Sequence, residues 1–233
     1  MPKKEKIRQM FDGIAPSYDR LNHVMSLNVD KLWRKYALRE IVDGGAPQQI
    51  LDVACGTGDS TIAIAAAAAP GSRITGVDIS EGMMALVMRK AAHEGVHDRI
   101  RLQVADGEAL PFADASFHRV TCAFGIRNFE HKELGLKEFH RVLKPGGKAV
   151  ILELSVPRNR VIRRLYDLYF LHLVPWIGGK FSGDKAAYQY LPASVHAFPA
   201  PERFCAMMAE AGFRDVRHKS LTFGLCRMYV GGK

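Results

Sequence analysis

From residue 49 to residue 154, short apolar runs alternate with longer segments of helical pattern. The first run, 49–53, passes through a Gly-x-Gly turn at Gly56 and Gly58 into the alanine-rich segment 59–68. Glycine permits a tight turn and lets a ligand approach the backbone closely. Further strands are predicted at 73–78, 99–104, 117–124 and 149–154, with helices at 80–94 and 132–143. This alternation predicts a doubly wound α/β fold, with a largely parallel sheet and helices on both faces.

Three of the predicted strands carry an acidic residue at or just beyond their carboxyl end, namely Asp52, Asp78 and Asp106. Asp78 follows Gly58 by 78 − 58 = 20 residues, the spacing at which a second strand presents a carboxylate to ribose hydroxyls. Thr61 stands where the dinucleotide fingerprint has Gly or Ala, and no Gly-Lys-Ser/Thr follows, so no phosphate cradle is complete. Carboxylates without a phosphate cradle suit a positively charged nucleoside such as S-adenosylmethionine.

The segment Ile50–Asp59 resembles motif I of the class I S-adenosylmethionine methyltransferases. The segments Phe11–Asn22, Phe124–Asn128 and 187–195 are similar to the ubiquinone/menaquinone biosynthesis C-methyltransferases. Motif I marks only the superfamily, whereas the other segments mark the family, and the likeness covers residues 11–231. It implies a Rossmann-like, mostly parallel seven-stranded sheet with an antiparallel strand near the C-terminus.

The resemblance also implies which residues bind S-adenosylmethionine, and after reaction its product S-adenosylhomocysteine. Asp78 would hold the ribose, and Ile79 beside it is assigned to the same site. Asp106 would accept a hydrogen bond from the adenine amine, while the backbone of Gly107 meets the ring. Each of the two acids also has a simpler interpretation, as a helix N-cap or a solvated loop residue.

The glycine turn and the N-terminal segment complete the implied cofactor site. Gly56, Thr57 and Gly58 would line the methionine part of the cofactor, and Asp52 would orient the turn. Tyr18 would belong to a lid over the cofactor, although it can also be a loop aromatic that packs on the sheet. We expect no metal site, because the four cysteines are far apart and form no Cys-x-x-Cys pair.

Three residues are predicted to be catalytic, namely Arg127, Asn128 and Tyr190. Arg127 and Asn128 follow the fourth strand, where class I enzymes face the transferring methyl, and Tyr190 is a substrate contact implied by resemblance. An arginine keeps its proton in proteins, so Arg127 suits holding a developing phenolate or polarising a water better than acting as a base. The alternative for Arg127 is an ordinary salt-bridge partner.

The resemblance implies transfer of a methyl group to a ring carbon of a prenylated hydroquinone. The expected reaction converts demethylmenaquinol to menaquinol, with the ubiquinol precursor as a second candidate substrate. Two alternatives stay open: a methyltransferase of a soluble small molecule, and a non-catalytic S-adenosylmethionine-binding component of a biosynthetic assembly. The family motifs and the apolar segment 161–176 favour the first interpretation.

We expect one domain over residues 1–233, with an N-terminal helical lid at 1–45 and a substrate-side insertion at 157–200. In the lid, a helix over 4–12 is predicted to break near Pro16, which disfavours helix in the residue before it. In the insertion, the segment 161–176 can cover the cleft, form a contact in a homodimer, or offer apolar surface to a long substrate.

The net charge of +9 has two interpretations. It can be a solvated surface, or it can attract anionic lipid headgroups and support transient association with a membrane. A nucleic-acid partner is not expected, because no recognition module is present. Scattered cysteines, no signal-peptide pattern and no apolar run near 18 residues predict a cytoplasmic protein, peripheral at most at the inner face of the membrane.

Overall fold

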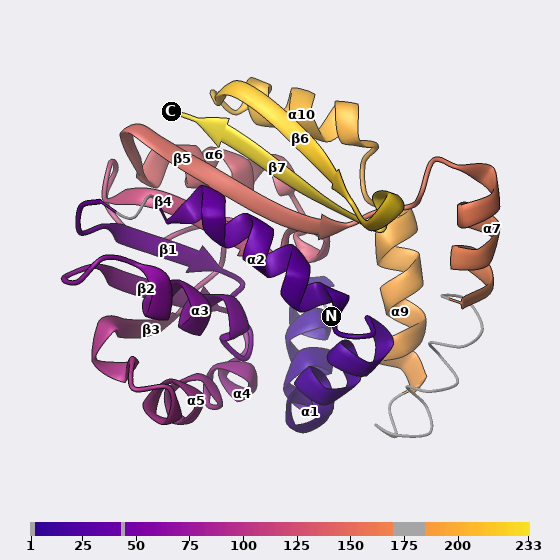
Figure 1. Cartoon of the computed structure of the whole chain (residues 1–233), viewed down its shortest axis with the longest axis horizontal. Helices are drawn as coiled ribbons and strands as arrows, with labels where there is room; N and C mark the ends of the chain where they lie inside the picture. The colour runs from indigo at the N-terminus through magenta and orange to yellow at the C-terminus, as the bar shows by residue number, and fades with distance from the viewer. Residues whose placement is uncertain (1–2, 43–44, 170–184) are drawn as a thin grey trace.

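A seven-stranded sheet organises the chain, in the strand order β3-β2-β1-β4-β5-β7-β6 (Figure 1). The computed structural model describes residues 3–42, 45–169 and 185–233. The first five strands pair in parallel, whereas β7 is antiparallel to both β5 and β6. The strands are β1 (Gln49–Val53), β2 (Arg73–Asp78), β3 (Ile100–Val104), β4 (Phe117–Ala123), β5 (Leu143–Leu154), β6 (Arg214–Leu221) and β7 (Cys226–Gly232). The predicted fold is therefore confirmed.

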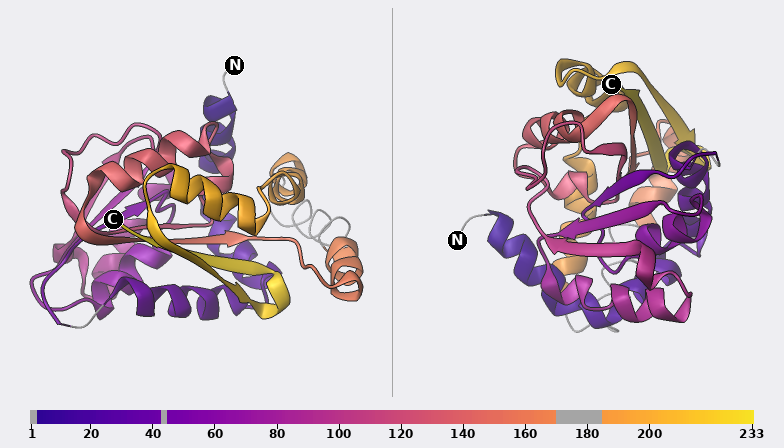
Figure 2. Two further views of the ribbon diagram at one scale, coloured as in Figure 1. Left: turned by 90° about the horizontal axis from the view of Figure 1, so that it is seen from above. Right: turned by 90° about the vertical axis from the view of Figure 1, so that its left-hand side faces the viewer.

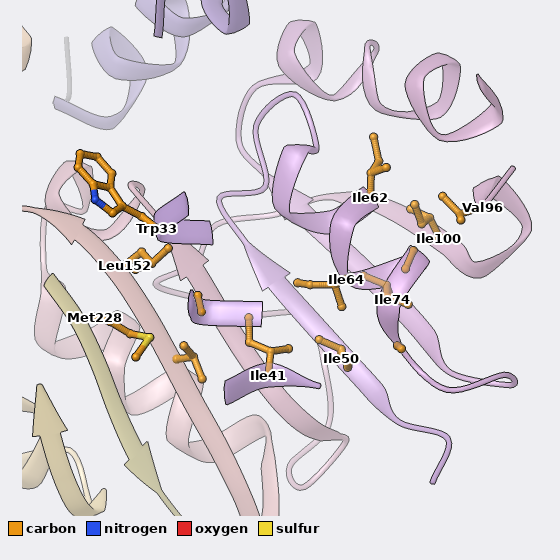
Figure 3. Close-up of a cluster of buried hydrophobic side chains, with 14 of the residues drawn as sticks. Trp33, Ile41, Ile50, Ile62, Ile64, Ile74, Val96, Ile100, Leu152 and Met228 are labelled. Atoms are coloured by element: carbon orange, nitrogen blue, oxygen red, sulfur yellow. The ribbon is translucent and has the colours of Figure 1, made fainter. Parts of the chain in front are cut away.

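Helices cover both faces of the sheet, because strand residues alternate between two cores. On one face, α2 (Val29–Ile41), α3 (Asp59–Ala67) and α5 (Val87–His93) pack on residues such as Ile50 (Figure 3). Trp33 of α2 joins this core and donates a 2.8 Å hydrogen bond from Nε1 to Oγ1 of Thr222. On the other face, α6 (Lys132–Val142) and α10 (Pro201–Glu210) pack on residues such as Leu51.

The carboxyl ends of the parallel strands point toward α1 (Lys3–Met25), α7 (Arg160–Leu168) and α9 (Lys185–His196) (Figures 1 and 2). A smaller cluster joins α1 to α4 (Glu81–Met84), through Ile14, Leu21 and Met83. Three short 3₁₀ turns complete the described chain: η1 (His97–Arg99), η2 (Ile126–Asn128) and η4 (Thr222–Gly224). This end of the sheet, where β1 and β4 lie side by side, is where α/β sheets bind ligands.

Helix α1 contradicts one sequence prediction, because it runs through Pro16 without a break. A proline inside a helix costs about 3 kcal/mol, and the local preference therefore favours a break. Ile14, Ala15 and Leu21 are all buried against neighbouring elements. Their packing outweighs the local cost, so the predicted helix over 4–12 extends to Met25.

The helix predicted over 80–94 forms as two helices, α4 and α5. Ser80 is the predicted N-cap, and its Oγ accepts a 3.1 Å hydrogen bond from the backbone N–H of Met83. Within the predicted lid at 1–45, α2 packs on the sheet, so only α1 lies over the strand ends.

The predicted insertion at 157–200 contains α7 and α9. Residues 170–184 lie outside the described residues, and so does the second half of the apolar segment 161–176. Among the residues that the structure describes, no helix combines the length and the apolar character required to cross a bilayer.

Candidate active site

The turn between β1 and α3 has a backbone geometry that requires glycine. Gly56 and Gly58 have φ values of 55° and 87°, in the left-handed region that other residues rarely adopt. A Cβ on Gly58 would also lie 2.6 Å from Cγ1 of Val87. The backbone of Gly56 borders a cavity of about 80 Å³, here called the first cavity, which is enclosed by this turn, the ends of β2 and β3, and α1.

Asp78, at the end of β2, faces the first cavity and organises the turn beside it. Its Oδ2 accepts a 2.8 Å hydrogen bond from the N–H of Gly56, and its Oδ1 accepts one of 2.9 Å from Ser80. Burial raises the pKa of Asp78 above its ordinary value, although these N–H donors pull it down. Ile79 also borders the first cavity. Asp78 and Ile79 therefore lie where the sequence predicted the ribose site.

Asp106 and Gly107 form the wall of the first cavity beyond β3. Oδ1 of Asp106 accepts a 3.0 Å hydrogen bond from the N–H of Glu108, and Oδ2 forms an ion pair with the ammonium of Lys4 on α1. A Cβ on Gly107 would lie 2.4 Å from Cζ of Phe129. Only glycine fits there, so the backbone itself forms the wall, as the predicted adenine contact requires.

Asp52 lies beneath the turn and not on the wall of the first cavity. Its carboxylate is 1% exposed, and Oδ2 accepts a 2.6 Å hydrogen bond from Oγ1 of Thr61. Oδ1 is buried and has no hydrogen-bond partner. Burial raises the pKa of Asp52 to about 6, although the hydrogen bond from Thr61 lowers it. Asp52 thus joins the end of β1 to the first turn of α3 and does not border the first cavity, and its role in orienting the glycine turn stays a prediction.

Helix α1 is fastened over the glycine turn by two aspartates to which the sequence analysis assigned no role. Oδ1 of Asp19 accepts a 2.5 Å hydrogen bond from Oγ1 of Thr57, and Oδ2 lies 2.8 Å from Nζ of Lys90. Oδ1 of Asp12 accepts hydrogen bonds from Oγ of Ser80 at 2.5 Å and from the N–H of Gly82 at 3.1 Å. The side chain of Thr57 is therefore turned toward α1 and away from the first cavity. Both aspartates stand in the Phe11–Asn22 motif, so their signal was present in the sequence.

A second cavity adjoins the first. Its volume is about 410 Å³, and most of its wall is apolar or aromatic, including side chains of α1, α2 and α7. Tyr18 and Phe124 border both cavities, so these two side chains form part of the wall between them. Burial raises the pKa of the Tyr18 phenol, which keeps this hydroxyl protonated.

Arg127 lies on the wall of the second cavity and forms a buried ion pair with Glu153 of β5. Nη1 of Arg127 lies 2.8 Å from Oε1 of Glu153, and the two side chains are 6% and 0% exposed. Oε2 of Glu153 also accepts a 3.1 Å hydrogen bond from the backbone N–H of Arg127. Burial alone lowers the pKa of Arg127, but the carboxylate of Glu153 more than offsets this, so the guanidinium stays charged.

Glu153 was missed by the sequence analysis, although the sequence held a signal. It stands alone among apolar residues in the predicted strand 149–154. A carboxylate in such a strand is buried, and a buried charge requires a partner.

The ion pair with Glu153 explains why Arg127 also fits the alternative interpretation, an ordinary salt-bridge partner. Nε of Arg127 is buried and has no hydrogen-bond partner among the described residues. One N–H donor of this guanidinium is therefore not used by the described part of the protein.

Asn128 and Tyr190, the other two predicted catalytic residues, are brought together. The hydroxyl of Tyr190 on α9 donates a 3.1 Å hydrogen bond to Oδ1 of Asn128, which borders the first cavity. Burial raises the pKa of the Tyr190 phenol. Arg127 therefore borders the second cavity and Asn128 the first, while Tyr190 contacts Asn128 and is not among the residues that line either cavity.

One group of potential metal ligands lies nearby. Ligand atoms of His23, Asp30 and Asp59 all fall within 4.8 Å of one another. Nζ of Lys90 lies 2.5 Å from Oδ1 of Asp59, and Nδ1 of His23 lies 2.9 Å from Oδ2 of Asp30. These carboxylates already have partners in the protein, and the group joins α1, α2, α3 and α5.

Residues 1–233 match the sequence profile of the ubiE/COQ5 methyltransferase family. The chain belongs to this family. The ubiquinone/menaquinone biosynthesis C-methyltransferase UbiE of Geobacter sulfurreducens is 50% identical over 233 residues, which cover 99% of this chain and 90% of that protein. The demethylmenaquinone methyltransferase of Chlorobaculum parvum is 45% identical, with 99% and 93% of the two chains covered.

Solved structures of methyltransferases share the fold at lower identity. A methyltransferase of Thermotoga maritima, described as S-adenosylmethionine-dependent, has a TM-score of 0.66 at 20% identity and covers 97% of this chain and 99% of its own. The family assignment confirms that the protein is a methyltransferase, and S-adenosylmethionine, the predicted cofactor, is its methyl donor.

Proposed function

We propose that the protein methylates a ring carbon of a prenylated hydroquinone in quinone biosynthesis. The proposed reaction is the conversion of demethylmenaquinol to menaquinol, with the ubiquinol precursor as a second substrate. Relatives named for these activities share 45–50% of the sequence over nearly the whole chain. The observation that carries the proposal is the position of Tyr18 and Phe124 on the walls of both cavities.

The first cavity has the chemistry that S-adenosylmethionine requires. Asp78 would hold the ribose hydroxyls, since each carboxylate oxygen can accept more than the one hydrogen bond it has here. Asp106 would accept from the adenine amine, and the backbone of Gly107, which borders the same cavity, would meet the ring. When bound there, the cofactor supplies an electrophilic methyl group on a sulfonium.

The second cavity would hold the quinol ring and the first part of its prenyl tail. The volume of about 410 Å³ lies within the range of small-molecule sites, and an apolar wall suits a prenyl chain. Residues from three helices exclude water from the ring, which favours attack by carbon on the methyl group.

Arg127 would stabilise the phenolate that the quinol becomes. Loss of the phenolic proton would push electron density onto the adjacent ring carbon. That carbon would form the new bond to the methyl group as the methyl–sulfur bond breaks, and its own hydrogen would then leave as a proton. The guanidinium is charged and fixed by Glu153, and fixed charges lower the barrier more than mobile ones. Asn128 and Tyr190 would orient the ring through the hydrogen bond that joins them.

We also propose that the enzyme associates transiently with the inner face of the membrane. A prenylated substrate partitions into the bilayer, and a net charge of +9 attracts a protein to anionic lipid.

The test is a mass-spectrometric assay of methylated product with isotope-labelled S-adenosylmethionine. We expect label in a short-tail demethylmenaquinol and none in a soluble phenol without a tail. The Asp78→Ala variant is the control, since it removes the acceptor proposed for the ribose and is expected to abolish labelling at low cofactor concentration. Equal labelling of both acceptors would contradict a prenylated substrate.

A further inference from the structure

The corner between α1 and α2 projects an apolar side chain into solvent. Leu27 and Asn28 have φ values of 52° and 61°, in the left-handed region that side-chain-bearing residues rarely adopt. This turn leaves the side chain of Leu27 78% exposed. We call residues 24–35 the α1–α2 corner. In Figure 1, α2 lies on the outer side of the sheet, facing the viewer.

Leu27 is part of a small apolar group and not an isolated surface leucine. Val24 is 52% exposed on the last turn of α1, and Leu32 is 48% exposed on the first turn of α2. Single exposed apolar side chains require no explanation, but several at one protruding turn indicate a contact surface. Leu27 also borders the second cavity, together with Met25 and Val29. Leu27 therefore lies at the lip of that cavity, with Val24 and Leu32 beside it on the corner.

Cations flank this group on the outer face of α2. Lys31 and Lys35 are exposed and stand one helical turn apart, on the same face as Leu32. Neither lysine forms an ion pair with any residue in the described ranges. Across a groove, Arg89 of α5 adds a third exposed cation. The corner thus combines apolar side chains with unpaired positive charge.

We propose that the α1–α2 corner docks on an anionic lipid bilayer and delivers the substrate from it. Leu27, with Val24 and Leu32 beside it, enters the boundary between headgroups and acyl chains, while Lys31 and Lys35 meet the anionic headgroups. This pattern is that of interfacial segments. The inference rests on the proposed function, because a prenylated quinol in the bilayer then meets the second cavity at its lip.

The test measures sedimentation of the full-length protein with vesicles of phosphatidylcholine, with and without phosphatidylglycerol. Replacing both lysines (Lys31→Gln with Lys35→Gln) is expected to lower binding to the anionic vesicles about 30-fold, the factor for two lysines near such a surface. Leu27→Gln is expected to lower it about tenfold or more. On neutral vesicles, the double lysine variant should bind as weakly as the wild type. Leu27→Gln should lower that weak binding by no more than the same factor of about ten.

Matched control variants separate this surface from net charge alone. Arg101→Gln with Lys137→Gln removes the same charge from exposed residues on edge strand β3 and on α6, which covers the opposite face. Leu134→Gln on α6 replaces another exposed leucine. We expect both controls to bind within about threefold of the wild type. Equal losses for the corner and control variants would overturn the proposal.

Two further readouts keep the result unambiguous. Turnover of a water-soluble short-tail quinol is expected to be unchanged in the double lysine variant, whereas turnover of a long-tail quinol in anionic vesicles falls with binding. A wild type that methylates neither quinol would refute the proposed function and not the docking surface. If Leu27→Gln changes the oligomeric state in solution instead of vesicle binding, the corner is an interface between two copies of the chain.

Discussion

The ion pair between Arg127 and Glu153 ties a proposed catalytic charge to the centre of the sheet. Glu153 lies in β5 and is fully buried, while Arg127 follows β4, its neighbour in the sheet. Breaking such a pair by removing one partner commonly costs 3–5 kcal/mol, because the other charge is left buried and alone. A substitution of Arg127 alone would therefore mix a loss of stability with a loss of catalysis.

A double substitution removes this ambiguity. Arg127→Ala combined with Glu153→Gln removes both charges of this pair, so neither is left buried without the other. We expect kcat to fall about 10²-fold, the usual loss for one group that stabilises transition-state charge. S-adenosylmethionine affinity should stay within about threefold, since neither side chain borders the first cavity. Calorimetry and steady-state kinetics check the two values. Turnover near the wild-type rate in a folded variant would make Arg127 a structural residue.

Asp52 makes the stability of the protein depend on pH. Burial raises its pKa to about 6, whereas a carboxyl in an unfolded chain has a pKa near 3.9. The folded state therefore holds this proton to a higher pH. Its contribution to the free energy of unfolding falls as the pH rises from about 4 to about 6, and is constant above that.

An asparagine side chain does not titrate. The Asp52→Asn variant is therefore expected to lack the fall in the free energy of unfolding that Asp52 causes as the pH rises. The stability of the variant relative to the wild type should rise by about 2 kcal/mol between pH 4 and pH 7, because most of a shift of roughly two pKa units, at 1.36 kcal/mol each, falls in this range. Urea unfolding at pH 4.5, 5.5 and 7 checks this. Parallel stability curves for the two proteins would show that Asp52 does not titrate in this range.

At the scale of elements, α1 restricts the first cavity. Side chains of α1, among them Lys4, Phe11 and Tyr18, contribute to its wall, and its volume is about 80 Å³. Small-molecule sites commonly measure about 300–1,000 Å³. A nucleoside-sized cofactor therefore requires α1 to move outward, and the first obstacle is the ion pair between Lys4 and Asp106.

Lys4→Ala is expected to tighten S-adenosylmethionine binding by up to about fivefold, because the cofactor no longer has to displace a partly exposed ion pair. The gain should shrink at high salt, which already screens that pair. Lys6→Ala is the control, since Lys6 is exposed on the same helix and forms no ion pair with the residues that the structure describes. Calorimetric titration gives both affinities. Weaker binding by Lys4→Ala would mean that Lys4 contacts the bound cofactor.

Strands were easier to predict than the N-terminal helix, and the reason is physical. Apolar runs such as 49–53 and 73–78 are buried on both faces, and their boundaries coincide with β1 and β2. Pro16 gave a local signal that packing of α1 outweighs. The strand-end acids were found because they follow such runs. Glu153 was not found, because its partner Arg127 is 26 residues away in sequence and only the folded sheet brings them together.

At the scale of the whole molecule, the sheet separates two apolar cores that use different helices. Phe139 of α6 is 0% exposed in the core that α6 and α10 cover. The other core, drawn in Figure 3, contains Trp33 of α2 and lies next to the second cavity. A loss of packing under α6 should therefore lower global stability. It would also reach the wall of the first cavity, because Phe139 packs edge-to-face on Phe129, which borders that cavity.

Phe139→Ala is expected to lower the free energy of unfolding by about 3–5 kcal/mol, the usual cost of truncating a buried phenylalanine. Leu134→Ala on the same helix is the control, and we expect it to change stability by no more than about 0.5 kcal/mol, because Leu134 is 46% exposed. Urea unfolding of both variants checks these values. A cost below about 1 kcal/mol for Phe139→Ala would mean that this core collapses readily around a void.

Tyr18 borders both cavities and belongs to α1, a helix that contributes side chains to each of them. An outward movement of α1 would therefore open the first and the second cavity together. The spent donor and the methylated product would then leave in the same step. We expect the spent donor and the methylated product to be released at the same rate, which is the kinetic signature of such a shared exit.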